Sequence, residues 1–176
     1  MNQHAEQRFA LEADLRRALD RDEFMICFQP LIDLRTGAIV KAAALIRWHH
    51  PSLGILPPGK FLQIVEDVGL GPRLGEWVLR AACTQARSWL AAGHTSIQLA
   101  VNLSDSQFHD VQLTNTVAKV LAETKFPSEL LDLELTETIM FRSPEHAIAT
   151  LQSLRILGVG LSLDDFGTGF YSLRHL

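Results

Sequence analysis

The sequence VGLSLDDFGTG at residues 159–169 joins a short apolar run to two carboxylates and a glycine-containing turn. A helical pattern from Pro144 to Leu157 precedes this run, and Gly158 is expected to end the helix. The run itself, Val159 to Leu163, has the length and composition of a buried strand. Because a helix leads directly into a strand here, the stretch predicts one unit of an α/β fold.

Toward the N-terminus the same alternation continues. A strand is expected from Ile97 to Leu103, a helix near Leu113 to Glu123, and a further strand from Leu131 to Leu135. Strands separated by helices predict parallel βα units. With right-handed crossovers, such units form either an open doubly wound sheet or a closed (β/α) barrel.

The N-terminal half of the chain predicts a different arrangement. Two strand-like runs, Phe24 to Leu34 and Ala38 to Trp48, flank a short turn and predict an antiparallel hairpin. His49 and His50 stand beside Pro51 without a metal-ligand partner at helical spacing, so we interpret both as loop residues. Helices are expected at Arg8 to Asp20, Phe61 to Val68 and Leu74 to Ala92.

The composition is typical of a single domain that spans residues 1–176. The chain is 47% hydrophobic, and its net charge of -4 with a pI near 5.9 gives no general attraction to DNA, RNA or anionic lipid. Residues 1–20 contain neither a signal peptide nor a membrane span. Cys27 and Cys83 are expected to be reduced core thiols. We therefore expect a cytoplasmic protein.

Polar residues interrupt three of the predicted parallel strands near their C-terminal ends. These residues are Asn102, Glu134 and the pair Asp164 and Asp165. Their polarity requires an explanation, because strands covered on both faces are almost continuously apolar. The C-terminal edge of parallel strands is where α/β folds assemble their sites. An asparagine and three carboxylates supply hard oxygen ligands for Mg²⁺ or Mn²⁺. A pair of such ions can clamp the oxygens of a phosphodiester.

Each of these residues also has a purely structural interpretation. Asn102 or Ser104 fits the cap of a following helix. Glu134 fits the solvated face of an antiparallel strand. Asp164 and Asp165 together fit a turn with a cap. Their occurrence once per successive strand favours the site over these alternatives.

The order of the motifs resembles the signature of EAL domains, and the resemblance covers nearly the whole chain. Its most specific part is the six-residue segment DDFGTG. The matching segments are Gln29-Pro30, Ala43-Ala44-Leu45-Ile46-Arg47-Trp48, Asn102-Leu103-Ser104, Glu134-Leu135-Thr136-Glu137 and Asp164-Asp165-Phe166-Gly167-Thr168-Gly169. The resemblance implies a TIM-type (β/α) barrel whose first strand is antiparallel. It also implies that cyclic di-GMP binds across the C-terminal rim and that two Mg²⁺ or Mn²⁺ ions support its hydrolysis to linear pGpG.

The resemblance further implies a role for each matching position. Metal ligands would be Asn102, Glu134 and Asp164, with Asp164 shared between the ions and Asp165 serving the second. Contacts to the nucleotide and its phosphate would come from Gln29, Leu45, Arg47 and Asp165. Glu137 resembles the residue that braces the loop after the fifth strand.

Two departures from the family pattern lead us to expect no hydrolysis. The name-giving glutamate should stand at position 43, where this chain has Ala43, natural or engineered, whose methyl group cannot ligate a metal. The sequence ends at Leu176, after the fifth expected strand, whereas barrels of this type run to about 250 residues. The remaining strands would carry the family's active-site lysine and general-base glutamate. Open sheet edges then predict a homo-oligomer.

Two other functions remain open at this stage. The chain could be a degenerate EAL domain that acts as a cyclic-di-GMP receptor or a protein-interaction module, which Ala43 favours if the change is natural. Intact Asn102, Glu134, Asp164 and Asp165 instead favour a working enzyme that has lost one ligand. The second is an unrelated α/β phosphohydrolase.

Overall fold

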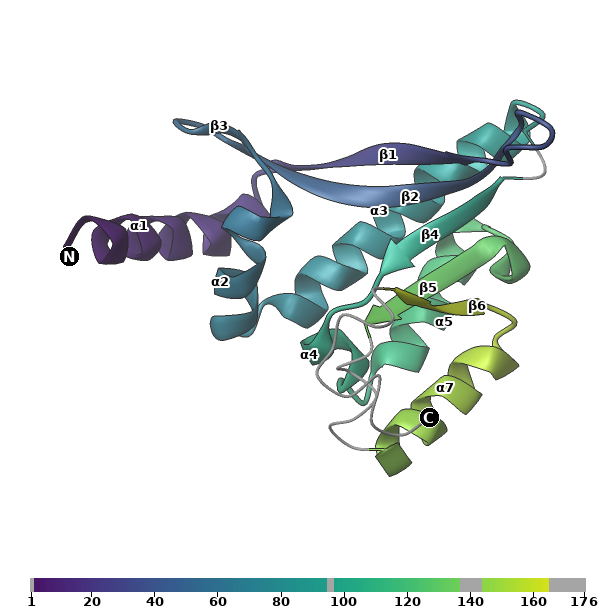
Figure 1. Cartoon of the computed structure of the whole chain (residues 1–176). Helices are drawn as coiled ribbons and strands as arrows, with labels where there is room; N and C mark the ends of the chain where they lie inside the picture. Colours follow the sequence, from purple (N-terminus) through teal and green to yellow (C-terminus); the bar gives the residue numbers. More distant parts are fainter. Residues whose placement is uncertain (1, 95–96, 137–143, 165–176) are drawn as a thin grey trace.

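The strands form one mixed sheet in the computed structural model, which describes residues 2–94, 97–136 and 144–164 (Figure 1). They are β1 (Phe24–Ile32), β2 (Ile39–His50), β3 (Gly54–Leu56), β4 (Gln98–Asn102), β5 (Leu131–Thr136) and β6 (Gly160–Asp164). The order is β1-β2-β4-β5-β6, with β3 paired to β2. β1 is antiparallel to β2, whereas β2, β4, β5 and β6 are parallel to one another. The predicted hairpin and βα units are therefore confirmed.

Helices cover one face of the parallel strands, with α3, α5 and α7 on the same side (Figure 1). The helices are α1 (Asn2–Ala18), α2 (Leu62–Asp67), α3 (Gly71–Ala91), α4 (Asp105–Phe108), α5 (Leu113–Thr124) and α7 (Pro144–Ile156). Leu79, Ala82, Cys83 and Ala86 of α3 are buried, and their spacing places them on one side of the helix. They pack in one core with Leu99, Val101, Leu131 and Leu133 from the sheet.

A second core cluster joins α1 and α2 to the start of β1 and the end of β2. Leu15 of α1 packs there with Phe24, Trp48, Phe61 and Val65. The indole N–H of Trp48 donates to a carboxylate oxygen of Glu23 at 3.0 Å. This cluster fixes the C-terminal end of β2.

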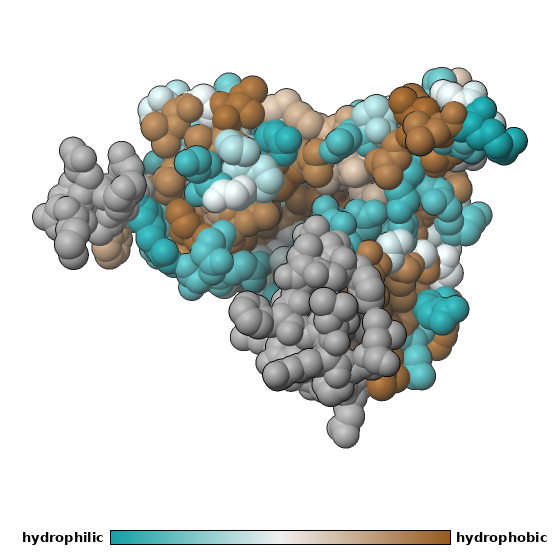
Figure 2. Space-filling view, in the orientation of Figure 1, coloured by the Kyte–Doolittle hydropathy of each residue, from teal (hydrophilic) through white to brown (hydrophobic). Residues whose placement is uncertain are grey.

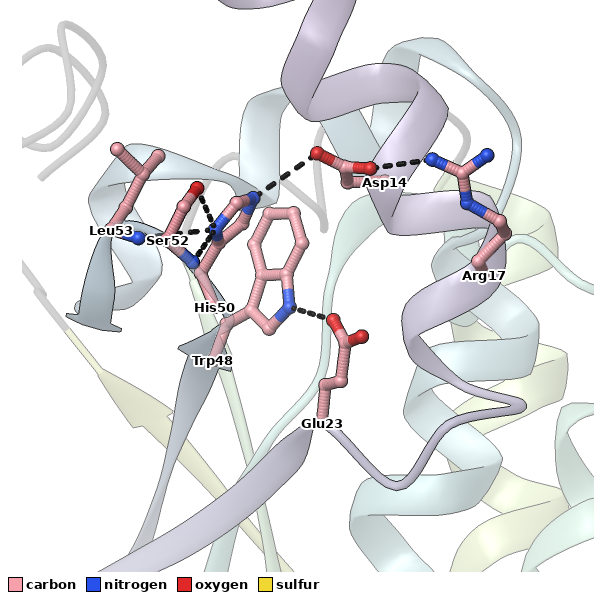
Figure 3. A network of polar contacts seen from close by, with 7 residues as sticks. All are labelled: Asp14, Arg17, Glu23, Trp48, His50, Ser52 and Leu53. Carbon is pink, nitrogen blue, oxygen red and sulfur yellow. Dashed lines mark hydrogen bonds and ion pairs between the residues drawn. The ribbon is translucent and has the colours of Figure 1, made fainter.

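The interpretation of His49 and His50 as loop residues is wrong. β2 continues through both, because β3 folds back and pairs with this end of the strand. His50 is buried, and its Nδ1 accepts hydrogen bonds from the backbone N–H groups of Ser52 and Leu53 at 3.2 and 3.3 Å (Figure 3). Its Nε2 must then carry the proton, which it donates to Asp14 of α1 at 3.2 Å.

Element boundaries also differ from the expectations. The first helix begins at Asn2 and ends at Ala18, earlier than the predicted Arg8 to Asp20. Cys83 lies in the core as expected, but Cys27 is only half-buried. None of the helices within the described ranges is long and apolar enough to cross a membrane.

Candidate functional site

The two faces of the sheet differ in chemistry. Along β2 the buried residues Ala42, Ala44 and Ile46 alternate with the half-buried Lys41, Ala43, Leu45 and Arg47. Because side chains in a strand point alternately to opposite faces, the second set lies away from the core beneath α3 and α5. Paired residues of neighbouring strands share a face, and Ala43 pairs with Ala100, which pairs with Asp132.

Following this register across the sheet defines one polar face. It carries Lys41, Ala43, Asn102, Asp132, Glu134, Ser162 and Asp164, each of which is an in-register partner or stands two residues from one. Asn102 pairs directly with Glu134, and Glu134 pairs with Ser162. Asp164 stands two residues beyond Ser162, so its side chain leaves the same face. Three predicted ligand residues therefore share one face of three consecutive strands.

Ala43 lies on the polar face between two other strands. Its partner on β1 is Gln29, and its partner on β4 is Ala100, two residues before Asn102. A side chain at position 43 thus points to the same side of the sheet as Asn102 and Glu134. Since the side chain present is a methyl group, this position contributes no oxygen ligand.

Two of the predicted nucleotide-contact residues, Leu45 and Arg47, lie in the C-terminal half of β2. Leu45 and Asn102 line a cavity of about 210 Å³ that also touches α2 and α3. Arg47 is half-buried, and its guanidinium donates to the carbonyl oxygen of Ile46 at 2.8 Å. Gln29 is exposed on β1. Gln29 therefore comes from β1, and Leu45 and Arg47 come from the neighbouring β2. The wall of the cavity is mostly apolar.

The helix-capping alternative holds for Ser104 and not for Asn102. The Ser104 hydroxyl accepts from the backbone N–H of Gln107, while the Gln107 amide oxygen accepts from the backbone N–H of Ser104, which forms a capping box at the start of α4. Asn102 is the exposed last residue of β4. Its amide is accordingly not the cap of that helix.

Lys41 makes the most buried ion pairs of the polar face. Its ammonium contacts a carboxylate oxygen of Asp132 and lies 3.2 Å from Oε1 of Glu134. Ser162 Oγ donates to the same Asp132 oxygen at 2.6 Å. Burial lowers the pKa of Lys41, but the hydrogen bonds that its ammonium donates to Asp132 and Glu134 outweigh burial, so the pKa is raised above its usual 10.5.

Sequence reasoning missed Lys41 and Asp132. The signal was present, because each interrupts an apolar strand at a period-two distance from a residue already singled out: Lys41 from Ala43, and Asp132 from Glu134. Two other predicted residues, Asp165 and Glu137, lie outside the described residues.

The oxygen donors present fit a hard divalent cation. Asn102, Glu134 and Asp164 offer amide and carboxylate oxygens, which suit Mg²⁺ or Mn²⁺. In the described part of the chain, no three histidine, cysteine or acidic side chains come together as a metal cluster. The possible oxygen ligands therefore include the amide of Asn102 as well as carboxylates, and each comes from a different strand. One of the carboxylates, Glu134, already contacts Lys41.

Comparison with known proteins gives one consistent family. The EAL domain model matches residues 12–176. The chain is 40% identical over 176 residues to the bifunctional diguanylate cyclase/cyclic di-GMP phosphodiesterase MucR of Pseudomonas aeruginosa, covering 100% of the chain and 26% of that relative. The cyclic di-GMP phosphodiesterase NbdA of the same species is 38% identical over 172 residues, covering 98% of the chain and 22% of NbdA. The chain thus spans about a quarter of the length of these relatives.

Solved structures agree with the sequence comparison. The MucR phosphodiesterase in complex with c-di-GMP has a TM-score of 0.88 at 40% identity, over 92% of this chain and 65% of that one. The FimX EAL domain of Xanthomonas citri, in complex with c-diGMP, has a TM-score of 0.83 at 26% identity, over 98% and 66%.

Proposed function

Because this chain belongs to the EAL domain family of cyclic-di-GMP phosphodiesterases, we propose that it binds cyclic di-GMP at the polar face and, with Ala43 in place of the motif glutamate, does not hydrolyse it. The predicted family and the predicted partial TIM-type barrel with an antiparallel first strand are confirmed. The observation that carries the proposal is that Asn102 and Glu134 lie on the same face of the sheet as Ala43.

The proposed binding divides between two groups of side chains. Arg47 would hold a phosphate through its planar guanidinium, while Gln29 and Leu45 would contact the rest of the nucleotide. Asn102, Glu134, Asp164 and Asp165 would hold two Mg²⁺ or Mn²⁺ ions. When bound, such ions stabilise charge on the attacking and leaving oxygens of a phosphodiester. Glu137 as a brace for the following loop stays a prediction.

The proposed inactivity follows from the chemistry of position 43. Loss of a group that merely supports a ligand typically lowers metal affinity or activity by roughly 10- to 100-fold. Loss of a ligand itself should have at least that effect. At this register position, β1, β2 and β4 carry Gln29, Ala43 and Ala100, so the Gln29 amide is the one side-chain oxygen there. We also place the domain in the cytoplasm, with cyclic di-GMP rather than a nucleic-acid polymer as its partner.

A receptor or protein-interaction module is the second candidate. The contact between Lys41 and Glu134 supports it, because a fixed ammonium compensates the carboxylate without any metal. Such a domain would bind the nucleotide through Arg47 and transmit binding rather than turnover. The two candidates differ in whether cyclic di-GMP binding requires a divalent ion.

Calorimetry combined with a hydrolysis assay tests the proposal. We expect the chain to bind cyclic di-GMP, Arg47→Met to weaken binding at least tenfold, and the control Arg16→Met on the exposed side of α1 to leave it unchanged. No pGpG should form above background with Mg²⁺ or Mn²⁺. Absence of binding, or binding insensitive to Arg47→Met, contradicts the proposed site, and metal-dependent pGpG release contradicts the role given to Ala43.

A further inference from the structure

A half-buried lysine contacts two carboxylates on the polar face. The side chain of Lys41 is 18% exposed, that of Asp132 11% and that of Glu134 18%. Lys41 starts on β2, whereas both carboxylates belong to β5, with β4 between them. Adjacent strands lie about 4.8 Å apart, so the lysine spans roughly 9.6 Å of sheet together with its partners.

The β4 residues along this path are Gln98, the direct partner of Lys41, and Ala100, the direct partner of Asp132. Ala100 stands in the register between Ala43 and Asp132, and its methyl group leaves room above β4 for the long lysine stem. The ammonium has a compact charge on a flexible chain, which suits it to bridge two acceptors. Lys41 therefore reaches β5 in a way that a bulky residue at position 100 would block.

The ammonium does what a bound cation would do for these carboxylates. A buried carboxylate without a compensating partner is unfavourable. Asp132 has the Ser162 hydroxyl as well as Lys41, whereas Oε1 of Glu134 accepts from the Lys41 ammonium at 3.2 Å. A divalent ion that binds Glu134 must either displace this ammonium from Oε1 or bind the other carboxylate oxygen with that positive charge nearby, and both lower its affinity.

We propose that Lys41 is a built-in counter-cation that competes with a divalent metal ion for Glu134 and thereby sets the metal affinity of the polar face. This inference rests on the proposed function, because it takes Glu134 as a metal ligand. Lys41 lies outside the segments that match the family pattern. The inference predicts opposite changes in Mn²⁺ affinity when Lys41 and when Asp132 loses its charge.

The predicted signs follow from the contacts. Lys41→Met removes the competitor and should tighten Mn²⁺ binding at least fivefold. Asp132→Asn removes the other charged partner of Lys41, so the ammonium pairs with Glu134 alone and Mn²⁺ binding should weaken. The double variant Lys41→Met/Asp132→Asn removes one positive and one negative charge. It keeps the net charge of the network, so tighter Mn²⁺ binding there reports competition rather than long-range attraction.

Calorimetric titration of the 176-residue chain with Mn²⁺ alone provides the test. Lys119→Met is the matched control, because it removes the same charge from a side chain that is 59% exposed on α5. We expect the single and double Lys41 variants to bind Mn²⁺ at least fivefold more tightly than the unmodified chain, and Lys119→Met to match it. If Lys41→Met fails to fold, the double variant alone decides.

A gain below fivefold in both Lys41 variants overturns the inference, as does an equal gain in Lys119→Met. Glu134→Gln separates this failure from failure of the proposed function. Mn²⁺ binding that is lost in Glu134→Gln but insensitive to Lys41 leaves the metal site in place and removes only the role of Lys41. If Mn²⁺ binding is unchanged in Glu134→Gln, or if no variant binds Mn²⁺, then both the proposed metal site and the role of Lys41 are wrong.

Discussion

Asn102 and Glu134 are direct partners in the parallel register between β4 and β5. Two residues that lie near the ends of separate strand-like runs in the sequence therefore lie side by side on one face, about 4.8 Å apart along the direction of the backbone hydrogen bonds. This pairing fixes where a cation could sit relative to Ala43, whose partner Ala100 precedes Asn102 by two residues.

Ala43→Glu should restore an oxygen ligand to the polar face. We expect Mn²⁺ affinity to rise by roughly tenfold or more, because a carboxylate at position 43 points toward the face that carries Asn102 and Glu134. Calorimetry measures the change. Ala91→Glu, at the exposed end of α3, adds the same charge elsewhere and should leave the affinity unchanged. Equal affinities in the two variants would show that position 43 does not face the ion.

Asp14→Ala should destabilise the fold through His50. The variant leaves the buried Nε2–H of His50 without its carboxylate acceptor, which costs about 1–2 kcal/mol of unfolding free energy. Urea unfolding at pH 7 measures this loss, and Glu129→Ala, which removes an exposed carboxylate, is the control. A loss no larger than that of the control would contradict the contact shown in Figure 3.

The same contact has a defined pH dependence. The Arg17 hydrogen bond, opposed by burial and aided by His50, holds the pKa of Asp14 below its usual 3.8. A lowered folded-state pKa stabilises the fold above the unfolded value, and this contribution is lost as the pH falls through the folded value. The stability difference between the unmodified chain and Asp14→Ala should therefore be full above pH 3.8 and shrink below it.

Cys83 should resist thiol reagents in the folded chain. Burial raises its pKa from 9.0 to about 12, so its thiolate fraction at pH 8 is lower by roughly 1000-fold. Mass spectrometry after brief iodoacetamide treatment should find label on the half-buried Cys27 and, before urea is added, almost none on Cys83. Equal labelling of both in the native state would mean that α3 does not pack as described.

The outer edge of β1 should promote self-association. In the part of the chain that the structure describes, β1 pairs only with β2, and Leu31 and Ile32 near its end are 43% and 52% exposed. Figure 2 shows hydrophobic residues gathered at this end of the hairpin, at the upper right. An unpaired edge with exposed apolar side chains is a template for another chain.

Sedimentation at micromolar concentration measures this association. We expect dimers or larger species, and a shift toward monomer in Leu31→Lys/Ile32→Lys. Val111→Lys, at a residue that is 78% exposed beyond α4, is the control and should not change the distribution. A stable monomer of the unmodified chain would contradict the expectation.

The sequence predicted the sheet well, because β4, β5 and β6 are largely apolar runs separated by helix signals. It also predicted that Asn102, Glu134 and Asp164 share an edge, since parallel strands end on the same side. It failed at His50, whose burial depends on the β3 hairpin and on Asp14, 36 residues earlier in the chain. Local polarity near Pro51 indicated a loop, and only tertiary packing reversed that.

Lys41 illustrates the other kind of failure. Its alternation with Ala43 places it on the polar face, but its partners Asp132 and Glu134 stand 91 and 93 residues later in the chain. Which strand neighbours which, and in what register, decides such a contact, and strand periodicity alone does not contain that information. The ion pairs therefore required the assembled sheet.

The most direct measurement is the position of Mn²⁺ in crystals of this chain grown with Mn²⁺ and cyclic di-GMP, from anomalous diffraction. We predict a peak on the polar face at coordination distance, about 2.1 Å, from side-chain oxygens of both Asn102 and Glu134. No peak there, or a peak held by other residues, would contradict the claim that these strands gather their oxygen ligands around a shared cation.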